Sequence, residues 1–210
     1  MRLVFSRCLS GLMAVLLLSV FSSLSSAEVL KIVVNDTIHP ITDEYVGRAI
    51  AEAERNKDEA LLIELNTPGG LLESTRHIIE KILASQVPII IYVTPSGSRA
   101  ASAGFFLLES ADVAAMAPGT NTGAAHPVTI GGGKMDDIMK TKIENDSAAL
   151  MRSVASKRSR NVDVADSAVR QSKSFTDQEA LSQKLIDYVA SSEEDLLNQM
   201  QGKTVKRFNG

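Results

Sequence analysis

A serine within a run of small residues is the side chain of this sequence best suited to covalent chemistry. It is Ser102 in Gly97-Ser98-Arg99-Ala100-Ala101-Ser102-Ala103-Gly104, a segment that follows an apolar, β-branched stretch. Small neighbours leave room for a substrate backbone beside the hydroxyl. A helix that begins here would also direct N–H groups and its positive dipole end at the same place. We therefore predict Ser102 as a nucleophile and the N–H of Ala103 as a donor to an oxyanion, although small residues that pack a helix tightly on a sheet would give the same pattern.

A second group of small residues, Asn66-Thr67-Pro68-Gly69-Gly70, follows another apolar stretch. Paired glycines let the backbone turn tightly and bring N–H groups close to a ligand. Donors placed in this way stabilise negative charge that develops on a carbonyl oxygen. The segment therefore indicates either an oxyanion site or an ordinary turn from a strand to a helix.

A nucleophilic serine also needs a neighbour that accepts its proton. Of the three histidines, only His126 lies close to the motifs in sequence, whereas His39 and His77 are expected at the surface. Lys142, near an amphipathic helical pattern, is the other candidate. A lysine base must be neutral, so an apolar pocket would have to lower its pKa from about 10.4 to roughly 7–8. The spacing of these residues leaves both candidates open.

The elements that would position these side chains alternate along the chain. Apolar, β-branched runs predict strands at 30–34, 61–65, 87–93, 113–116 and 185–189. Helical spacing of apolar residues predicts helices near 46–53, 78–83, 102–110, 143–154, 165–169, 177–181 and 193–200. Between them, 129–133 contains three consecutive glycines and is predicted to be a mobile loop. This order predicts one layered α/β domain with mainly parallel strands and flanking helices.

The first 27 residues have the three parts of a secretory signal. Arg2 and Arg7 precede an apolar run at 12–21, and small residues lead up to Ala27. We predict cleavage before Glu28, the alternative being an uncleaved anchor. The protein is then exported, to a periplasmic or other extracytoplasmic location, with one domain at 28–202 and a polar tail at 203–210.

Composition excludes several classes of function. The single cysteine, Cys8, lies in the predicted signal, so the mature domain would have no disulfide and no cysteine-bound metal. We predict no metal and no cofactor. Removal of residues 1–27 takes away two of the 22 basic residues and none of the 25 acidic ones, which changes the net charge from −3 to −5. A net negative charge gives no electrostatic basis for binding nucleic acid.

Taken together, these segments resemble the NfeD-type membrane-associated serine proteases of the ClpP class. The resemblance runs from about Val29 to Gly202, and four blocks match in order: Asn66-Thr67-Pro68-Gly69-Gly70-Leu71, Gly97 to Gly104, Ala117-Pro118-Gly119-Thr120-Asn121-Thr122-Gly123-Ala124, and Glu179-Ala180-Leu181. It implies a ClpP/crotonase-like fold and a Ser-Lys dyad of Ser102 and Lys142. It also implies oxyanion donors at the N–H groups of Gly70 and Ala103, with Gly69 as the fallback.

Ordinary ClpP peptidases use Ser-His-Asp instead, and His126 lies 24 residues after Ser102, near where such a histidine would fall. The orienting aspartate would sit just before Ser174, where this chain has Ser172 and Lys173. A histidine without that carboxylate is a weaker base. We therefore favour Lys142 and keep His126 as the alternative base.

The resemblance further implies an exported serine endopeptidase that cleaves hydrophobic segments of membrane proteins, such as stomatin-like partners. We expect a homodimer or larger homo-oligomer. In this family membrane-spanning helices follow the protease segment, so a chain of 210 residues is expected to be a fragment or a short form. Two alternatives stay open: a non-catalytic ClpP-fold scaffold for membrane proteins, and a crotonase-like acyl-CoA enzyme, against which an export signal counts.

Overall fold

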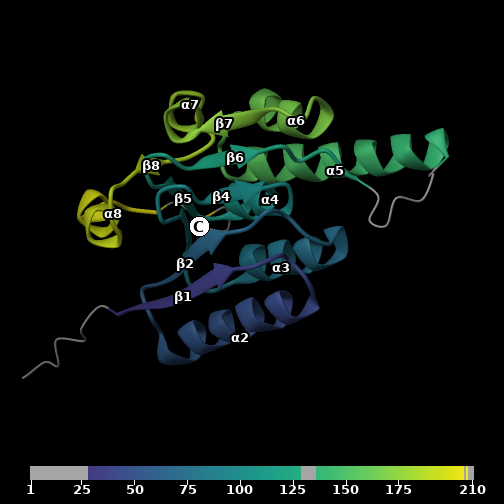
Figure 1. The fold of residues 1–210 in the computed structure, drawn as a ribbon. Coiled ribbons are helices and arrows are strands. Elements are labelled where there is room, and N and C mark those ends of the chain that lie inside the picture. The colour runs from purple at the N-terminus through teal and green to yellow at the C-terminus, as the bar shows by residue number, and fades with distance from the viewer. Residues whose placement is uncertain (1–27, 129–135, 206, 208–210) are drawn as a thin grey trace, which may run out of the picture.

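The computed structural model describes residues 28–128, 136–205 and 207. Its centre is a five-stranded parallel sheet with the strand order β1-β2-β3-β5-β8 (Figure 1). The strands are β1 (Val29–Asn35), β2 (Ala60–Asn66), β3 (Ile89–Val93), β5 (Val113–Met116) and β8 (Tyr188–Val189). The mainly parallel α/β architecture predicted from the sequence is therefore confirmed.

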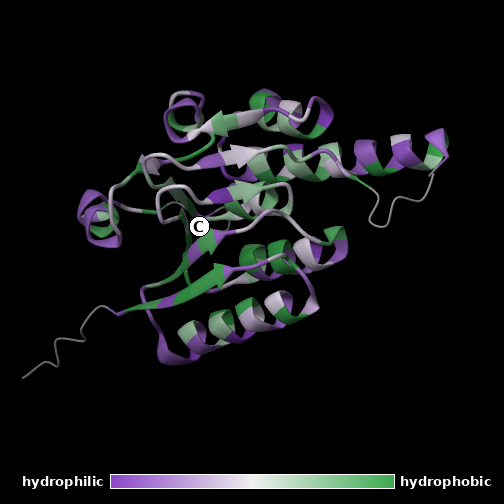
Figure 2. Cartoon of the chain, in the orientation of Figure 1, coloured by the Kyte–Doolittle hydropathy of each residue, from purple (hydrophilic) through white to green (hydrophobic). Residues whose placement is uncertain are grey.

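Both faces of this sheet are covered, as expected for a parallel sheet. Alternate side chains of a strand point to opposite faces. Leu61, Ile63 and Leu65 of β2 belong to the larger core beneath the helices, whereas Leu62 belongs to a smaller cluster that includes Leu196. Hydrophobic residues accordingly follow the strands and the inner faces of the helices (Figure 2).

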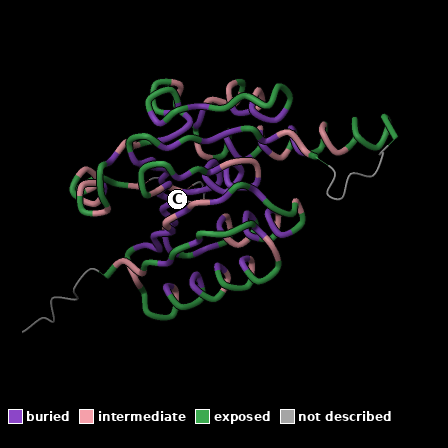
Figure 3. The backbone as a smooth tube through the Cα atoms, in the orientation of Figure 1, coloured by how far each residue is buried: buried purple, intermediate pink, exposed green. Residues whose placement is uncertain are grey.

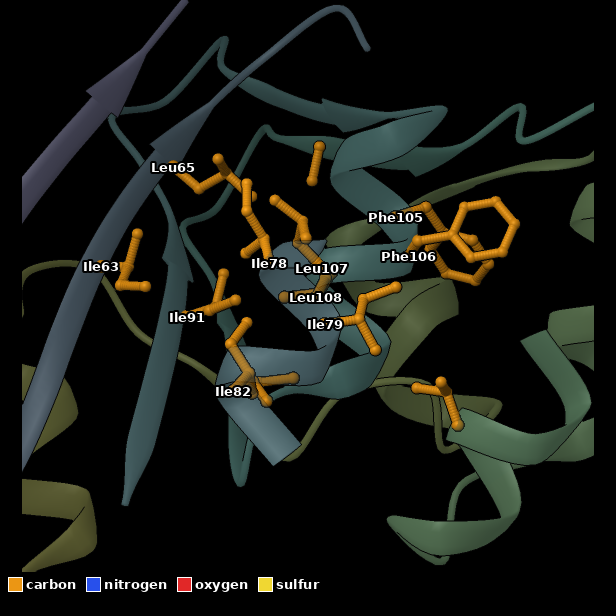
Figure 4. Packing of buried hydrophobic residues seen from close by; sticks show 14 of the residues in the cluster. Ile63, Leu65, Ile78, Ile79, Ile82, Ile91, Phe105, Phe106, Leu107 and Leu108 are labelled. Atoms are coloured by element: carbon orange, nitrogen blue, oxygen red, sulfur yellow. The ribbon is translucent and has the colours of Figure 1, made fainter. Parts of the chain in front are cut away.

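One part of the larger core lies between the sheet and three helices, α2 (Pro40–Asn56), α3 (Leu72–Ala84) and α4 (Ala103–Ser110). Isoleucines of α3 pack between strand residues and the side chains of α4 (Figure 4). Every residue of α4 is buried, and its mid-helix run Phe105, Phe106, Leu107 and Leu108 is core. The remaining helices are α5 (Asp137–Lys157), α6 (Val162–Arg170), α7 (Asp177–Ser182) and α8 (Glu193–Met200).

A second, three-stranded sheet was not predicted. It has the order β4-β6-β7, from β4 (Arg99–Ala101), β6 (Asn121–Gly123) and β7 (Ser174–Thr176). β4 and β6 are parallel, and β7 is antiparallel to β6. Strands of three residues have no alternating pattern to detect, and they form only because distant segments meet. This sheet matters for the site because β4 leads directly into Ser102.

Three of the differences between predicted and observed element boundaries have a local physical cause. The strand predicted at 87–93 begins at Ile89, because Pro88 has no N–H for a strand ladder. The strand predicted at 185–189 is reduced to β8, because the N–H groups of Leu185 and Ile186 bond to the carbonyl of Ala180. The helix predicted near 143–154 begins already at Asp137, where Asp136 caps it by accepting a hydrogen bond from Met139 N–H.

The predicted signal at 1–27 and the predicted loop at 129–133 lie outside the described residues. Within the described ranges, no helix has both the length and the hydropathy required to cross a bilayer.

Candidate active site

Ser102 lies between β4 and α4 in a backbone conformation that residues other than glycine rarely adopt. Its φ is 51° and its ψ is −112°. Such a conformation costs on the order of 1–3 kcal/mol and persists only where the surroundings impose it. Here the Ser102 N–H donates to the carbonyl of Gly123 at 2.9 Å, and the Ser102 carbonyl accepts from Phe105 N–H at 3.0 Å. β6 and α4 together hold the residue in place.

The Ser102 hydroxyl is not used for capping. Ser102 occupies the N-cap position of α4, where a serine side chain normally accepts a hydrogen bond from a backbone N–H of the first turn. In this helix no such side-chain bond forms. The hydroxyl is thus available to a substrate at the positive end of the α4 dipole.

A pocket of about 320 Å³ opens beside Ser102. The start of α3, α4, the segment after β6, and α5 supply its walls. Most of the lining is apolar, with Leu71, Leu72, Phe106, Pro127, Val128 and Ile143. An apolar side chain of a substrate therefore fits this pocket, and the predicted neighbours Gly70 and Ala103 are also part of its wall.

The turn at Gly69 and Gly70 lies against the serine. A Cβ on Gly69, whose φ is 129°, would stand 2.9 Å from Ser102 Cβ. A Cβ on Gly70 would stand 2.1 Å from the carbonyl oxygen of Ile38. Ile38 holds the turn from outside, since its N–H donates to Gly69 O and its carbonyl accepts from Leu71 N–H, each at 2.8 Å. Only glycine permits both close approaches.

The hydrogen bonds of the turn distinguish the two glycines as oxyanion donors. The Gly69 N–H already donates to Thr67 Oγ1 at 3.2 Å. Within the described part of the chain, the N–H groups of Gly70 and Ala103 donate to no protein acceptor. The pair predicted first, Gly70 and Ala103, is therefore the pair with free donors.

Lys142 does not line this pocket. It is exposed in the second turn of α5, whose N-terminal end projects beyond the neighbouring helices (Figures 1 and 3). Lys142 lies inside the helix rather than before the predicted start near 143, because α5 begins at Asp137. Ile143 and Ser147 of the same helix do line the pocket. The structure thus brings Ser102, Ala103 and Gly70 together and leaves Lys142 next to a wall residue.

His126 is half-buried beside the same wall, between Ala125 and Pro127, which both line the pocket. Its Nδ1 lies 3.0 Å from the carbonyl oxygen of Val169. Because a carbonyl only accepts, Nδ1 carries the proton in this contact, and in a neutral ring Nε2 would be the acceptor. The orienting partner of His126 is hence a neutral carbonyl, which stabilises an imidazolium less than a carboxylate does.

Two features of the site had no role assigned from the sequence. Thr67 is fully buried, and its Oγ1 both accepts from Gly69 N–H and donates to Gly69 O at 3.1 Å, which holds the turn closed. Ser147 lies on the apolar face of α5. A polar residue at that place is the sequence feature that could have indicated a role for it. Among the described residues no group of three or more His, Cys, Asp or Glu side chains could hold a metal ion.

The strand order, the buried α4 and the serine at its N-terminus define a ClpP-like α/β protein. ClpP1 from Listeria monocytogenes superposes with a TM-score of 0.64 over 79% of this chain and 94% of its own, at 15% identity, which is a likeness of fold. More specifically, the chain belongs to the family described as NfeD1b, N-terminal domain, whose model matches residues 28–205. The family resemblance and the fold expected from the sequence are confirmed.

Relatives in this family are named as proteases. The membrane-bound protease PH1510 of Pyrococcus horikoshii is 36% identical over 167 residues, which are 79% of this chain and 38% of that protein. A solved structure described as the 1510-N membrane-bound stomatin-specific protease, a serine-to-alanine mutant, has a TM-score of 0.80 at 34% identity and covers 87% of this chain and 89% of its own. A lysine-to-alanine mutant in complex with a substrate peptide has a TM-score of 0.79 at 31% identity, over 88% and 90%. This chain spans less than two-fifths of the length of PH1510.

Proposed function

We propose that this protein is a serine endopeptidase with Ser102 as its nucleophile. The observation that carries the proposal is the strained backbone of Ser102 at the N-terminus of α4, with its hydroxyl excluded from capping and directed to an apolar pocket. Backbone strain at a serine that caps nothing has no benefit for stability. It is typical of a nucleophile held at a sharp turn from a strand to a helix.

The proposed reaction follows from the groups around this serine. Ser102 Oγ attacks the carbonyl carbon of the scissile peptide bond while the base removes the hydroxyl proton. The N–H groups of Gly70 and Ala103 donate to the oxyanion of the tetrahedral intermediate. The base then protonates the leaving amine. Water next attacks the acyl carbon while the base removes its proton, and the base returns that proton to Ser102 Oγ as the acid product leaves.

Lys142 is the proposed base, with His126 as the alternative. Lys142 is exposed, but it directly precedes Ile143, which lines the pocket. The lysine stem has four flexible carbons, so rotation about its bonds can redirect the amine. Catalytic contacts of substrate-free enzymes are often long and tighten only when substrate binds.

The proposed substrates are hydrophobic segments of membrane proteins, with stomatin-like proteins as the first class to test. The apolar pocket suits such segments, and solved relatives are described as stomatin-specific. We further propose residues 1–27 as an export signal, 28–202 as the protease domain and 203–210 as a polar tail. We also propose that the protein forms a homodimer or larger homo-oligomer on the extracytoplasmic side of a membrane.

Labelling with a fluorophosphonate probe tests the nucleophile directly. The full chain should be labelled at Ser102, as mapped by peptide mass spectrometry, and should hydrolyse an apolar fluorogenic peptide. Ser102→Ala should lose both signals, with turnover reduced by about 10³-fold or more, while circular dichroism stays unchanged.

Ser98→Ala is the matched control, because Ser98 is a buried serine of the same segment that does not line the pocket. It should keep labelling and turnover. Undiminished hydrolysis by Ser102→Ala would remove Ser102 from the mechanism, and a folded chain that neither labels nor hydrolyses would favour the non-catalytic scaffold.

A further inference from the structure

The pocket beside Ser102 contains a buried hydroxyl without a hydrogen-bond partner. Ser147 of α5 lines the pocket, its relative exposure is 0%, and its Oγ makes no hydrogen bond within the described residues. A serine inside a helix usually bonds to the carbonyl four residues earlier, here that of Ile143. An unpaired buried hydroxyl costs about 1–3 kcal/mol, so this one requires an explanation.

The other hydroxyl in the wall, besides the nucleophile, is already satisfied. Thr75 Oγ1 donates to the carbonyl of Leu71 at 2.8 Å. Most of the remaining lining is apolar and offers no side-chain partner. Apart from the proposed catalytic groups, Ser147 is consequently the polar side chain of the described wall that has no hydrogen-bond partner.

We propose that Ser147 determines substrate specificity by hydrogen bonding to the tip of the substrate side chain that enters the pocket. The inference rests on the proposed function, because it assumes that peptides bind beside Ser102. The pocket then selects a side chain with an apolar body and a single polar group at its end.

Tyrosine fits this description better than other side chains. It has an apolar ring and one hydroxyl, which both donates and accepts and thus matches one serine hydroxyl. A volume of about 320 Å³ accommodates an aromatic ring. Glutamine would carry two or three further hydrogen-bonding sites into an apolar wall, and lysine would carry a charge, so each would bury unpaired polar groups.

Phenylalanine is the matched competitor, since it differs from tyrosine by the hydroxyl alone. A purely apolar pocket discriminates weakly between such isosteres, whereas a pocket that bonds the hydroxyl discriminates more strongly. We expect wild-type protein to cleave a peptide with Tyr before the scissile bond about tenfold more efficiently, as kcat/KM, than the same peptide with Phe. Ser147→Ala should bring the ratio to within about twofold, mainly by loss of efficiency with Tyr.

Binding to Ser102→Ala gives the same comparison without catalysis. The Kd of each peptide is measured by fluorescence anisotropy on Ser102→Ala and on the double variant Ser102→Ala, Ser147→Ala. Ser85→Ala in the same background is the control, because Ser85 is a buried serine whose Oγ donates to the carbonyl of Val87 and which does not line the pocket. The control should keep the Tyr preference, and the thermal midpoint of Ser147→Ala should be equal or higher because an unpaired buried hydroxyl is removed.

The outcomes separate the two proposals. Tight binding with a Tyr preference that depends on Ser147, but without cleavage by the wild type, would support the inference and overturn the peptidase function. Cleavage of both peptides without a Tyr preference, or with a preference that Ser147→Ala leaves intact, would overturn the inference alone. Failure to bind either peptide would overturn both.

Discussion

At the scale of single residues, the position of Ser102 differs from that of its proposed base. Contacts from β6 and α4 hold the backbone of Ser102 at a φ of 51°, so the nucleophile is in place before substrate arrives. Lys142 is exposed and has to move. Such a division between a fixed nucleophile and a mobile base would keep the hydroxyl inactive until a peptide fills the pocket.

The choice of base can be tested by three substitutions. If Lys142 is the base, Lys142→Ala should lower kcat by two to four orders of magnitude, about the contribution of general base catalysis. Lys142→Arg should lose as much, because arginine does not give up its proton at usable pH. His126→Ala should cost less than about tenfold, since it removes only a contact with the carbonyl of Val169.

The pH profile provides a second measurement of the same choice. A lysine base acts when neutral, so kcat/KM should rise with pH into the alkaline range. A histidine base would instead complete its rise near its ordinary pKa of about 6.5. An inactive His126→Ala beside an active Lys142→Ala would replace the Ser-Lys dyad by a Ser-His pair.

At the scale of elements, the turn between β2 and α3 is built to place one N–H group. Thr67 closes the turn from inside through both of its bonds to Gly69, and Ile38 holds it from outside. Gly104 lets α4 approach the same turn, since a Cβ there would stand 2.5 Å from Thr67 Cγ2. Strand, turn and helix are therefore packed around backbone groups, and small residues are needed at each contact.

Gly70→Ala should damage both catalysis and stability. Its Cβ would stand 2.1 Å from the carbonyl oxygen of Ile38, so the backbone must shift and carry the Gly70 N–H away from the oxyanion. We expect kcat to fall by about 10²–10³, the usual cost of one oxyanion donor, and the free energy of unfolding to fall by about 1–3 kcal/mol. Peptide kinetics and urea unfolding measure the two effects.

Gly97→Ala is the control for this prediction. Gly97 has a φ of 88° but nothing within 4 Å of an added Cβ, so its substitution adds backbone strain without a collision. It should lower stability by about 1 kcal/mol and leave kcat within about twofold. Equal losses of activity in the two variants would mean that the turn has no specific role.

At the scale of the whole molecule, buried polar groups connect α4 to the loop between α5 and α6 and to the segment before β8. Glu109 of α4 is fully buried, and neither carboxylate oxygen has a hydrogen-bond partner within the described residues. Arg160 donates to the carbonyl of Glu109 and pairs with Asp187 at 3.1 Å. Burial raises the pKa of Glu109 to about 8, with Arg160 opposing this effect and Asp187 adding to it.

The raised pKa makes the stability depend on pH. In the unfolded chain Glu109 loses its proton near pH 4.5, whereas in the folded protein it keeps the proton until about pH 8. The contribution of the neutral carboxyl to the free energy of unfolding is thus complete below pH 4.5 and is lost as the pH rises through 8. Urea unfolding at pH 5, 7 and 9 should show that the free energy of unfolding decreases by about 2–5 kcal/mol between pH 5 and pH 9 because Glu109 ionises.

Glu109→Gln should flatten this decrease, because the amide does not ionise. The exposed Glu80 of α3 provides the control, since Glu80→Gln changes the net charge equally without touching the core. Wild-type stability that rises from pH 5 to 9, or a slope that Glu109→Gln leaves unchanged, would contradict the assignment of the neutral form.

Much of this protein follows from patterns that are local in the chain. Apolar runs predicted β1, β2 and β5, and helical spacing predicted α2, α3 and α8, because such patterns arise within a few residues and do not depend on distant partners. The small residues around Ser102 and the paired glycines at 69 and 70 were recognised for the same reason. Each is a property of one short segment.

Other features depended on segments that are far apart in sequence. The sheet of β4, β6 and β7 joins residues near 100, 122 and 175, none of which has a strand pattern of its own. The free N–H of Gly70, as opposed to Gly69, depends on which acceptors Thr67 and Ile38 bring to the turn. The exposure of Lys142 and the burial of Ser147 depend on which face of α5 meets α4. Hydrogen-bond partners and burial are properties of the surroundings of a residue, and only the folded chain supplies those surroundings.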